Sequence, residues 1–141
     1  MIIVDTNVIS ELFRPAPARQ VETWLADQDG ANLYFTTIGE TELRHGVEIL
    51  PSGKRRTALT RAIEGILEED FRDRILPFDR QAASAYAAIA AERRALGRPI
   101  SQFDCQIAAI AREHGASVAT RNTSDYESCG VDLLNPWDQQ S

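Results

Sequence analysis

The sequence predicts one α/β domain, residues 1–141, with a mainly parallel central sheet. Short apolar runs alternate with amphipathic segments along the chain, as expected for strands that are joined by helices. The first run, Ile2 to Val4, is β-branched and contains no polar residue, which is typical of a strand buried on both faces of a parallel sheet. A chain of 141 residues is long enough to bury about two thirds of its unfolded surface without disulfides or structural metal.

The composition limits the kinds of partner and compartment. Fifteen Lys and Arg against twenty-one Asp and Glu give a net charge of -6, which argues against non-specific nucleic-acid binding through a globally basic surface. A nucleic-acid substrate would need a metal ion or local arginine clusters to offset the acids. Cys105 and Cys129 match no C-x-x-C spacing, so we expect reduced thiols in a cytoplasmic protein. No leader and no run of membrane-spanning length is recognisable, so no membrane association is expected.

The first half of the chain predicts two strands and three helices in order. After the first strand, apolar residues at helical spacing predict a helix over residues 8–13 and a short helix around residues 21–25. Leu33 to Phe35 form the second strand candidate. A helix over residues 38–50 follows, with Thr37 as the expected N-cap and Glu40 as its capping-box partner.

The next helix opens with a basic cluster and is followed by a third strand. This cluster is either a solvated face or a candidate surface for RNA or a partner protein, and consists of Lys54, Arg55, Arg56 and Arg61. Arg74 to Phe78 form the third strand candidate, and Asp79 caps an alanine-rich helix over residues 80–96. The small residues of that helix are typical of close packing in a core or a dimer.

The last third predicts one further helix and two strands. Ser101 begins a helix that ends at His114 and Gly115, where both residue types are common for dipole and geometric reasons. Ala116 to Ala119 form a buried strand, and Val131 to Leu134 form the last one.

Asp5 is the first candidate functional acid. It stands where the first strand ends, with Thr6 and Asn7 behind it, and the carboxyl ends of strands are where open α/β sheets bind ligands. This placement suggests a metal or phosphate site. The alternative is that Asp5 or Thr6 only caps the following helix.

Glu42 is the second candidate. It lies roughly 200° around its helix from Glu40, so the expected capping role of Glu40 does not extend to it. Two apolar rows leave open which face of the helix is buried: one is Ile38, Gly46 and Ile49, which Glu42 shares, and the other is Leu43, Val47 and Leu50.

Asp104 and Asp125 are the third and fourth candidates. Asp104 follows Ser101 by three residues, as in a capping box, but it also lies on the apolar stripe of its helix. A carboxylate on such a stripe must be paired, hydrogen-bonded or bound to a metal. Asp125 follows Asn122 by three residues, so these two residues can together cap a helical turn.

Several segments carry a resemblance to a known family. They are MIIVDTNVISEL, TELRHG with LPSGKRR after it, RPISQFDCQIAAIA, and ATRNTSDYE followed by VDLLNPW. In this order and spacing, across nearly the whole chain, they resemble VapC-type toxins with a PIN domain, in particular the FitB-like branch. The resemblance implies a three-layer α/β/α PIN domain and a metal-dependent endoribonuclease that is held inactive by a cognate antitoxin.

The resemblance also implies the roles of individual residues. Asp5, Glu42 and Asp104 match the three central acids of the family site, and either Asn122 or Asp125 corresponds to the fourth position. Thr6 and Thr120 would be hydroxyl ligands or donors to the ligands, and Arg121 is a candidate phosphate contact. Phe103 stands where smaller residues are usual, which should affect packing more than chemistry.

The acids fit a hard divalent cation. Converging carboxylates repel one another, and Mg²⁺ or Mn²⁺ with oxygen ligands relieves that repulsion. One or two such ions would polarise a phosphodiester and lower the pKa of a bound water. No plausible set of His and Cys ligands supports zinc.

The expected partners are an RNA substrate, a VapB-type or FitA-like antitoxin and a second copy of the chain, with operator DNA reached only through the antitoxin. The alternative is a catalytically inactive PIN-fold binding module that acts with an antitoxin in transcriptional autoregulation. Phosphotransfer and serine-hydrolase functions find no support, because neither D-x-D-x-T after the first strand nor G-x-S-x-G is present.

Overall fold

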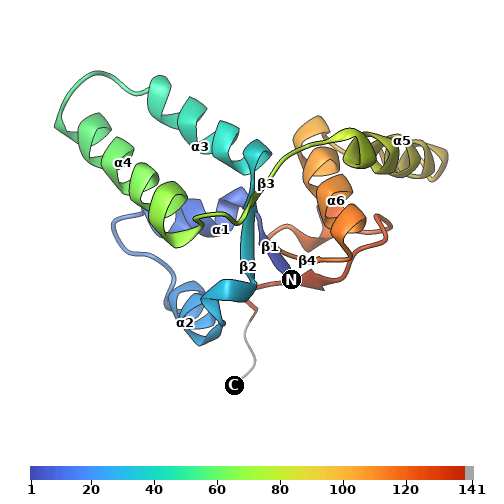
Figure 1. Cartoon of the computed structure of the whole chain (residues 1–141), viewed down its shortest axis with the longest axis horizontal. Coiled ribbons are helices and arrows are strands. Elements are labelled where there is room, and N and C mark those ends of the chain that lie inside the picture. Colours follow the sequence, from blue (N-terminus) through green and yellow to red (C-terminus); the bar gives the residue numbers. More distant parts are fainter. Residues whose placement is uncertain (139–141) are drawn as a thin grey trace.

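A five-stranded parallel sheet forms the centre of the computed structural model, which describes residues 1–138 (Figure 1). Within these residues every strand pair is parallel, and the strand order is β3-β2-β1-β4-β5. The strands are β1 (Ile2–Val4), β2 (Leu33–Thr36), β3 (Ile75–Leu76), β4 (Ser117–Ala119) and β5 (Leu133–Leu134). The expected parallel α/β sheet is therefore confirmed.

Helices cover both faces of this sheet. They are α1 (Thr6–Glu11), α2 (Arg19–Asp27), α3 (Thr37–Glu48), α4 (Lys54–Gly65), α5 (Arg80–Ala95) and α6 (Gln102–His114). Shorter helical turns are η1 (Gly30–Asn32), the π-helix η2 (Ile66–Asp70) and η3 (Thr123–Tyr126). In Figure 1, α1 to α4 lie on one side of the strands and α5 and α6 on the other.

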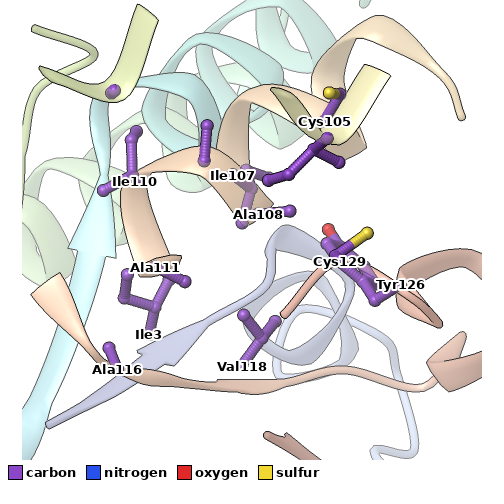
Figure 2. Close-up of a cluster of buried hydrophobic side chains, with 13 residues drawn as sticks. Ile3, Cys105, Ile107, Ala108, Ile110, Ala111, Ala116, Val118, Tyr126 and Cys129 are labelled. Carbon is purple, nitrogen blue, oxygen red and sulfur yellow. The ribbon is translucent and has the colours of Figure 1, made fainter. Parts of the chain in front are cut away.

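Two hydrophobic clusters, one on each face of the sheet, hold the helices against it and so produce three layers. Ile3 packs with α5, α6 and Val118 in one cluster, which Figure 2 shows, and Val4 packs with α1 to α4 in the other. Neighbouring residues of a strand point to opposite faces, so this short strand serves both clusters. The architecture is the expected three-layer α/β/α arrangement.

The order of the strands places a crevice beside β1. The chain leaves β1 toward β2 and β3 on one side, then returns through α5 and α6 to β4 on the other side of β1. Ile3 pairs with Val118 in register, and the Asp5 backbone N–H donates to the Ala119 carbonyl at 2.9 Å. The carboxyl ends of β1 and β4 thus meet at the point where the strand order reverses, which is where open α/β sheets bind ligands.

Several element boundaries differ from those predicted. The first helix begins at Thr6 rather than residue 8, with Asp5 as its N-cap. The N-cap of α3 is Thr36, whose hydroxyl accepts from the Gly39 N–H at 3.0 Å, so the prediction of Thr37 was wrong by one residue. Glu40 consequently makes no capping box and instead pairs with Arg44 at 2.7 Å.

Other local predictions agree with the structure. Asp79 caps α5 and Ser101 caps α6, each by accepting a backbone N–H, and Gly115 ends α6 in the left-handed conformation at φ 62°. The third and fifth strands are shorter than predicted, at two residues each. No helix in residues 1–138 combines the length and apolar character needed to cross a bilayer.

Candidate functional site

Asp5 lies at the centre of the crevice and is almost fully buried, with 6% of its surface exposed. Its Oδ1 accepts the Thr6 backbone N–H at 2.7 Å, which is the N-cap bond of α1. Its Oδ2 accepts the Thr120 hydroxyl at 2.7 Å and the Asn7 amide at 3.3 Å. Asp5 therefore caps the helix and also faces the crevice, so the two roles considered for it from the sequence are compatible.

Thr120 ties the end of β4 to Asp5. Its hydroxyl donates to Asp5 and accepts from the Asn7 side chain at 3.3 Å and from the Asn122 backbone N–H at 3.1 Å. A threonine hydroxyl offers one donor and two acceptor sites, so every site is used. This fully used hydroxyl fixes the orientation of the Asp5 carboxylate.

Thr6 links Asp5 to Glu42. Its backbone N–H donates to Asp5, and its hydroxyl donates to Glu42 Oε1 at 2.8 Å. Glu42 is half-buried on α3, while Leu43 and Val47 form the buried row of that helix and Gly46 and Ile49 are exposed. In the row that Glu42 shares, the later residues Gly46 and Ile49 therefore face away from the core, whereas Glu42 itself reaches Thr6 at the crevice.

Asp104 approaches the site from the first turn of α6. Ser101 caps this helix through the Asp104 backbone N–H at 3.3 Å, which leaves the Asp104 carboxylate free of the cap. Asp104 Oδ1 accepts the Tyr126 hydroxyl at 3.3 Å, and the same hydroxyl lies close enough to Asp5 for the two groups to shift each other's pKa. Tyr126 thus joins two of the predicted acids.

The electrostatics show that three acids share one environment. Burial raises the pKa of Asp5 most, the Thr120 and Thr6 hydrogen bonds oppose that rise, and the nearby Asp104 charge adds to it. Burial also raises the pKa of Glu42, and the charges of Asp5 and Asp104 raise it further against the Thr6 hydrogen bond. Burial and the same two aspartates raise the pKa of Tyr126 far above its usual range, so its hydroxyl remains a neutral donor.

The other predicted residues lie at the rim. Asp125 is exposed on η3, and its charge is not among those that shift the pKa of Asp5 or Glu42. Asn122 occupies the N-cap position of η3, as one of the alternatives from the sequence had it, but its side chain makes no cap bond there. Arg121 is exposed, and its guanidinium lies 5.2 Å from the centre of the Trp137 ring.

Sequence reasoning missed two contributors to the site. Tyr126 is 1% exposed and sits beneath the acids, and its hydroxyl is visible in the cluster of Figure 2. Trp137 comes from the C-terminal segment after β5 and supports Arg121. An aromatic residue directly after a candidate acid was the available signal for Tyr126, whereas nothing in the local sequence connects Trp137 with Arg121.

A cleft of about 390 Å³ opens beside the acids. Its lining includes Thr6, the acids Glu42 and Glu11, the arginines Arg14 and Arg121, and Trp137. An acidic edge and a guanidinium in one cleft suit a ligand that carries both a cation and an anionic group.

The donor set fits a hard divalent cation. Asp5, Glu42 and Asp104 offer carboxylate oxygens and Thr6 adds a hydroxyl oxygen, which is the ligand chemistry of Mg²⁺ and Mn²⁺. Thr120 acts as a donor to Asp5, because its hydroxyl has no acceptor site left for an ion. Within residues 1–138 no three acidic, His or Cys side chains are already gathered closely enough to hold an ion. Side-chain rotation of Glu42 or Asp104 would therefore accompany binding.

Comparisons with known proteins identify the family. Residues 2–127 match the family model described as PIN domain. The chain is 44% identical over 138 residues to the VapC ribonuclease Y4jK of Sinorhizobium fredii, covering 98% of this chain and 99% of that one. It is 40% identical over 137 residues to the toxin FitB of Neisseria gonorrhoeae, covering 97% and 99%.

The fold agrees with this assignment. A solved structure of FitAB bound to an IR36 DNA fragment superposes with a TM-score of 0.95 at 38% identity, covering 100% of this chain and 99% of that one. The overall fold is thus shared with that structure. The chain belongs to the PIN-domain ribonuclease family, in the branch that contains the VapC and FitB toxins.

Proposed function

We propose that this chain is a Mg²⁺- or Mn²⁺-dependent endoribonuclease and the toxin of a toxin–antitoxin pair. The observation that carries the proposal is the shared environment of Asp5, Glu42 and Asp104, in which burial and mutual repulsion raise the pKa of the first two. A buried group of like charges is costly unless a cation offsets it. The name of the relative Y4jK, a VapC ribonuclease, supports RNA as the substrate.

Asp5 and Asp104 are the residues that would hold the ion. Thr6, Asn7 and Thr120 hold the Asp5 carboxylate in one orientation, and Tyr126 does the same for Asp104. When bound, the ion supplies charge stabilisation for a phosphodiester and a bound water of lowered pKa. Asp125, on the exposed η3 turn, is proposed as the fourth carboxylate of the site.

Glu42 is the residue proposed to orient the attacking water or to bind a second ion. Thr6 holds one of its oxygens, so the other can face the cleft. A raised pKa brings a carboxylate closer to the range in which it accepts a proton efficiently near neutral pH. Arg121, supported by the Trp137 ring, lines the same cleft and is the proposed phosphate contact.

The partner part of the proposal is a FitA-like or VapB-type antitoxin, with a homodimer of this chain in the assembly. The support is the likeness to FitB in a FitAB complex that was solved on DNA. In this scheme operator DNA is contacted through the antitoxin, because a chain of net charge -6 has no globally basic surface for it.

Asp104→Asn tests the enzymatic proposal. The change keeps the size and the acceptor for Tyr126 but removes one charge from the ion site, so RNA cleavage with Mg²⁺ or Mn²⁺ should fall at least about a hundredfold. The measurement is cleavage of transfer RNA and of single-stranded oligonucleotides by gel. Asp132→Asn is the control, because Asp132 is exposed and its charge is not among those that shift the pKa of Asp5 or Glu42.

Antitoxin binding and the circular dichroism spectrum should be unchanged in Asp104→Asn. Cleavage that survives this substitution would place the active site elsewhere. A wild-type chain that binds the antitoxin but cuts no RNA with either metal would favour the alternative, a PIN-fold binding module in transcriptional autoregulation.

A further inference from the structure

The basic cluster at the start of α4 is divided between two surfaces of the helix. Arg56 pairs with Glu48 at 3.0 Å, and Arg44 pairs with Glu64 at 2.7 Å. These four side chains line one hollow of about 230 Å³ between α3 and α4, where the positive and negative charges balance. That hollow therefore has no net preference for an anion.

Arg55 faces a different hollow. It is exposed, and no ion pair found within residues 1–138 involves it. Together with Arg14 it lines a hollow of about 500 Å³ between α1 and α4 that contains no acidic residue. Phe13 and Leu59, both half-buried, contribute apolar surface to the same hollow. Arg55 has no ion-pair partner among the described residues, and Arg14 pairs only with Glu11, which does not line this hollow. These two guanidinium groups beside an aromatic and an aliphatic side chain suit a ligand with anionic and planar apolar parts.

This second hollow adjoins the cleft of the candidate site. Ser10 and Arg14 line both, so the two hollows meet at these residues at the end of α1 and just after it. Arg14 stands at the junction with 61% of its side chain exposed, and Glu11 anchors it at 3.3 Å. Arginines thus follow one another from Arg121 in the cleft, through Arg14, to Arg55.

We propose that the cleft and the adjoining hollow form one path for single-stranded RNA, in which Arg14 and Arg55 bind backbone phosphates beside the cut and Phe13 with Leu59 receives a base. The inference rests on the proposed ribonuclease function. The charge argument is local, because the molecule as a whole carries -6. Glu11 and Glu42 offset part of the positive charge in the cleft, whereas the adjoining hollow contains Arg14 and Arg55 and no acidic residue, so the hollow is the part of this surface that favours phosphates.

A single strand fits this path better than a duplex. Bases in a duplex are stacked and paired, whereas a single strand can turn a base onto an aromatic side chain while its phosphates follow a basic groove. The hollow offers both kinds of contact within one set of residues, Phe13 and Leu59 for a base and Arg14 and Arg55 for phosphates.

Arg55→Gln and Arg56→Gln form a matched pair for the test. They are adjacent on α4 and lose the same charge, but only Arg55 lines the proposed path. Each is made in the Asp104→Asn background, so that RNA binds without being cut, and binding of a labelled single-stranded RNA of about ten nucleotides is followed by anisotropy. The same pair is made in the wild-type background for cleavage kinetics.

Arg55→Gln should weaken RNA binding about fivefold and lower the slope of log K against log salt by about 0.7, the value for one lost phosphate contact with a single strand. KM for cleavage should rise by a similar factor with kcat unchanged, because Arg55 lies away from the reacting phosphate. Arg56→Gln should match its parent in every measurement. A duplex of the same sequence should bind more weakly than the single strand.

Three results would overturn the path: equal RNA affinities for the two variants, an unchanged salt slope in Arg55→Gln, or a loss confined to antitoxin binding, which would make the hollow a protein-docking surface. The proposed function fails separately. If the wild type cuts no RNA with either metal, the ribonuclease proposal is wrong, while a selective binding defect in Arg55→Gln still supports an RNA path.

Discussion

Asp5 and Asp104 each take part in a helix cap and also lie at the candidate site. Asp5 caps α1 with one oxygen and accepts Thr120 with the other, and Asp104 gives only its backbone N–H to the cap of α6. Capping and chemistry were competing interpretations in the sequence, yet they use different atoms of the same residue. An acid at a helix start next to a strand end can therefore be a cap and a functional residue. Which of its atoms make the cap determines which oxygens are left to bind a ligand.

The pH dependence of the stability of Glu42→Gln tests the repulsion among the acids. The folded-state pKa of Glu42 is raised, so the folded chain holds that proton more tightly than the unfolded chain, and stability is lost as pH rises through the raised pKa. In EDTA, Glu42→Gln should melt above the wild type at about pH 7.5, and the difference should shrink as the pH falls toward about 3, where Glu42 is protonated in both the folded and the unfolded chain.

The control for this measurement is Glu40→Gln on the same helix, which loses only an exposed pair with Arg44 and should change stability by less than about 1 kcal/mol. A Glu42→Gln chain that is less stable than the wild type at neutral pH without metal would show that the Thr6 hydrogen bond outweighs the repulsion.

The residues that sequence reasoning could find were those with a local signal. Asp5, Glu42 and Asp104 stand beside strand ends or on a helix face, and the structure brings them into one environment. The one local signal for Tyr126 was its position directly after Asp125, which does not reveal its partner, because its contact with Asp104 joins two segments 22 residues apart. The place of Asp125 in the shell stays a prediction.

At the scale of elements, the η3 turn depends on one buried arginine. Arg93 of α5 is 4% exposed, and its guanidinium donates to the carbonyls of Asp125 and Glu127 at 2.8 and 2.9 Å. It also donates to the Arg98 carbonyl at 2.7 Å. Because two of these carbonyls flank Tyr126, α5 positions the residue that joins Asp5 to Asp104.

Arg93→Lys should loosen this turn. A lysine cannot reproduce the planar fork of donors, so buried carbonyls would lose partners and the free energy of unfolding should fall by about 2–3 kcal/mol. Denaturant unfolding measures the loss, and amide hydrogen exchange should accelerate in residues 123–129. Arg94→Lys, the exposed neighbour, is the control. Equal stability of the two variants would mean that Arg93 does not hold the turn.

The predicted start of α3 was wrong because two neighbouring residues of the same type could each be its N-cap. Thr36 and Thr37 are equally good caps in isolation. Thr36 becomes the N-cap because its strand pairing with Leu76 holds it in the extended conformation. Gly39, whose N–H Thr36 accepts, packs so closely on Phe35 that a Cβ there would lie 2.5 Å from the ring. Such choices depend on contacts between elements, which short-range patterns do not contain.

At the scale of the whole molecule, the topology gathers acids from distant parts of the chain. Asp5 follows β1, Glu42 lies on the helix after β2, and Asp104 begins the helix before β4. Parallel strands place their carboxyl ends on one edge, and the reversal of strand order beside β1 opens the crevice there. The alternation of apolar runs predicted this class of sheet, whereas the strand order required the structure.

The melting temperature with and without millimolar Mg²⁺ or Mn²⁺, for the wild type and Asp104→Asn, tests the central claim that these acids form a cation site. An ion at a hundred times its Kd adds about 2.7 kcal/mol to the stability of the wild type, or roughly 8 °C. Without metal, Asp104→Asn should melt above the wild type, and added metal should change it little. A wild type that responds to neither ion, or an Asp104→Asn chain that responds as strongly as the wild type, would contradict the claim.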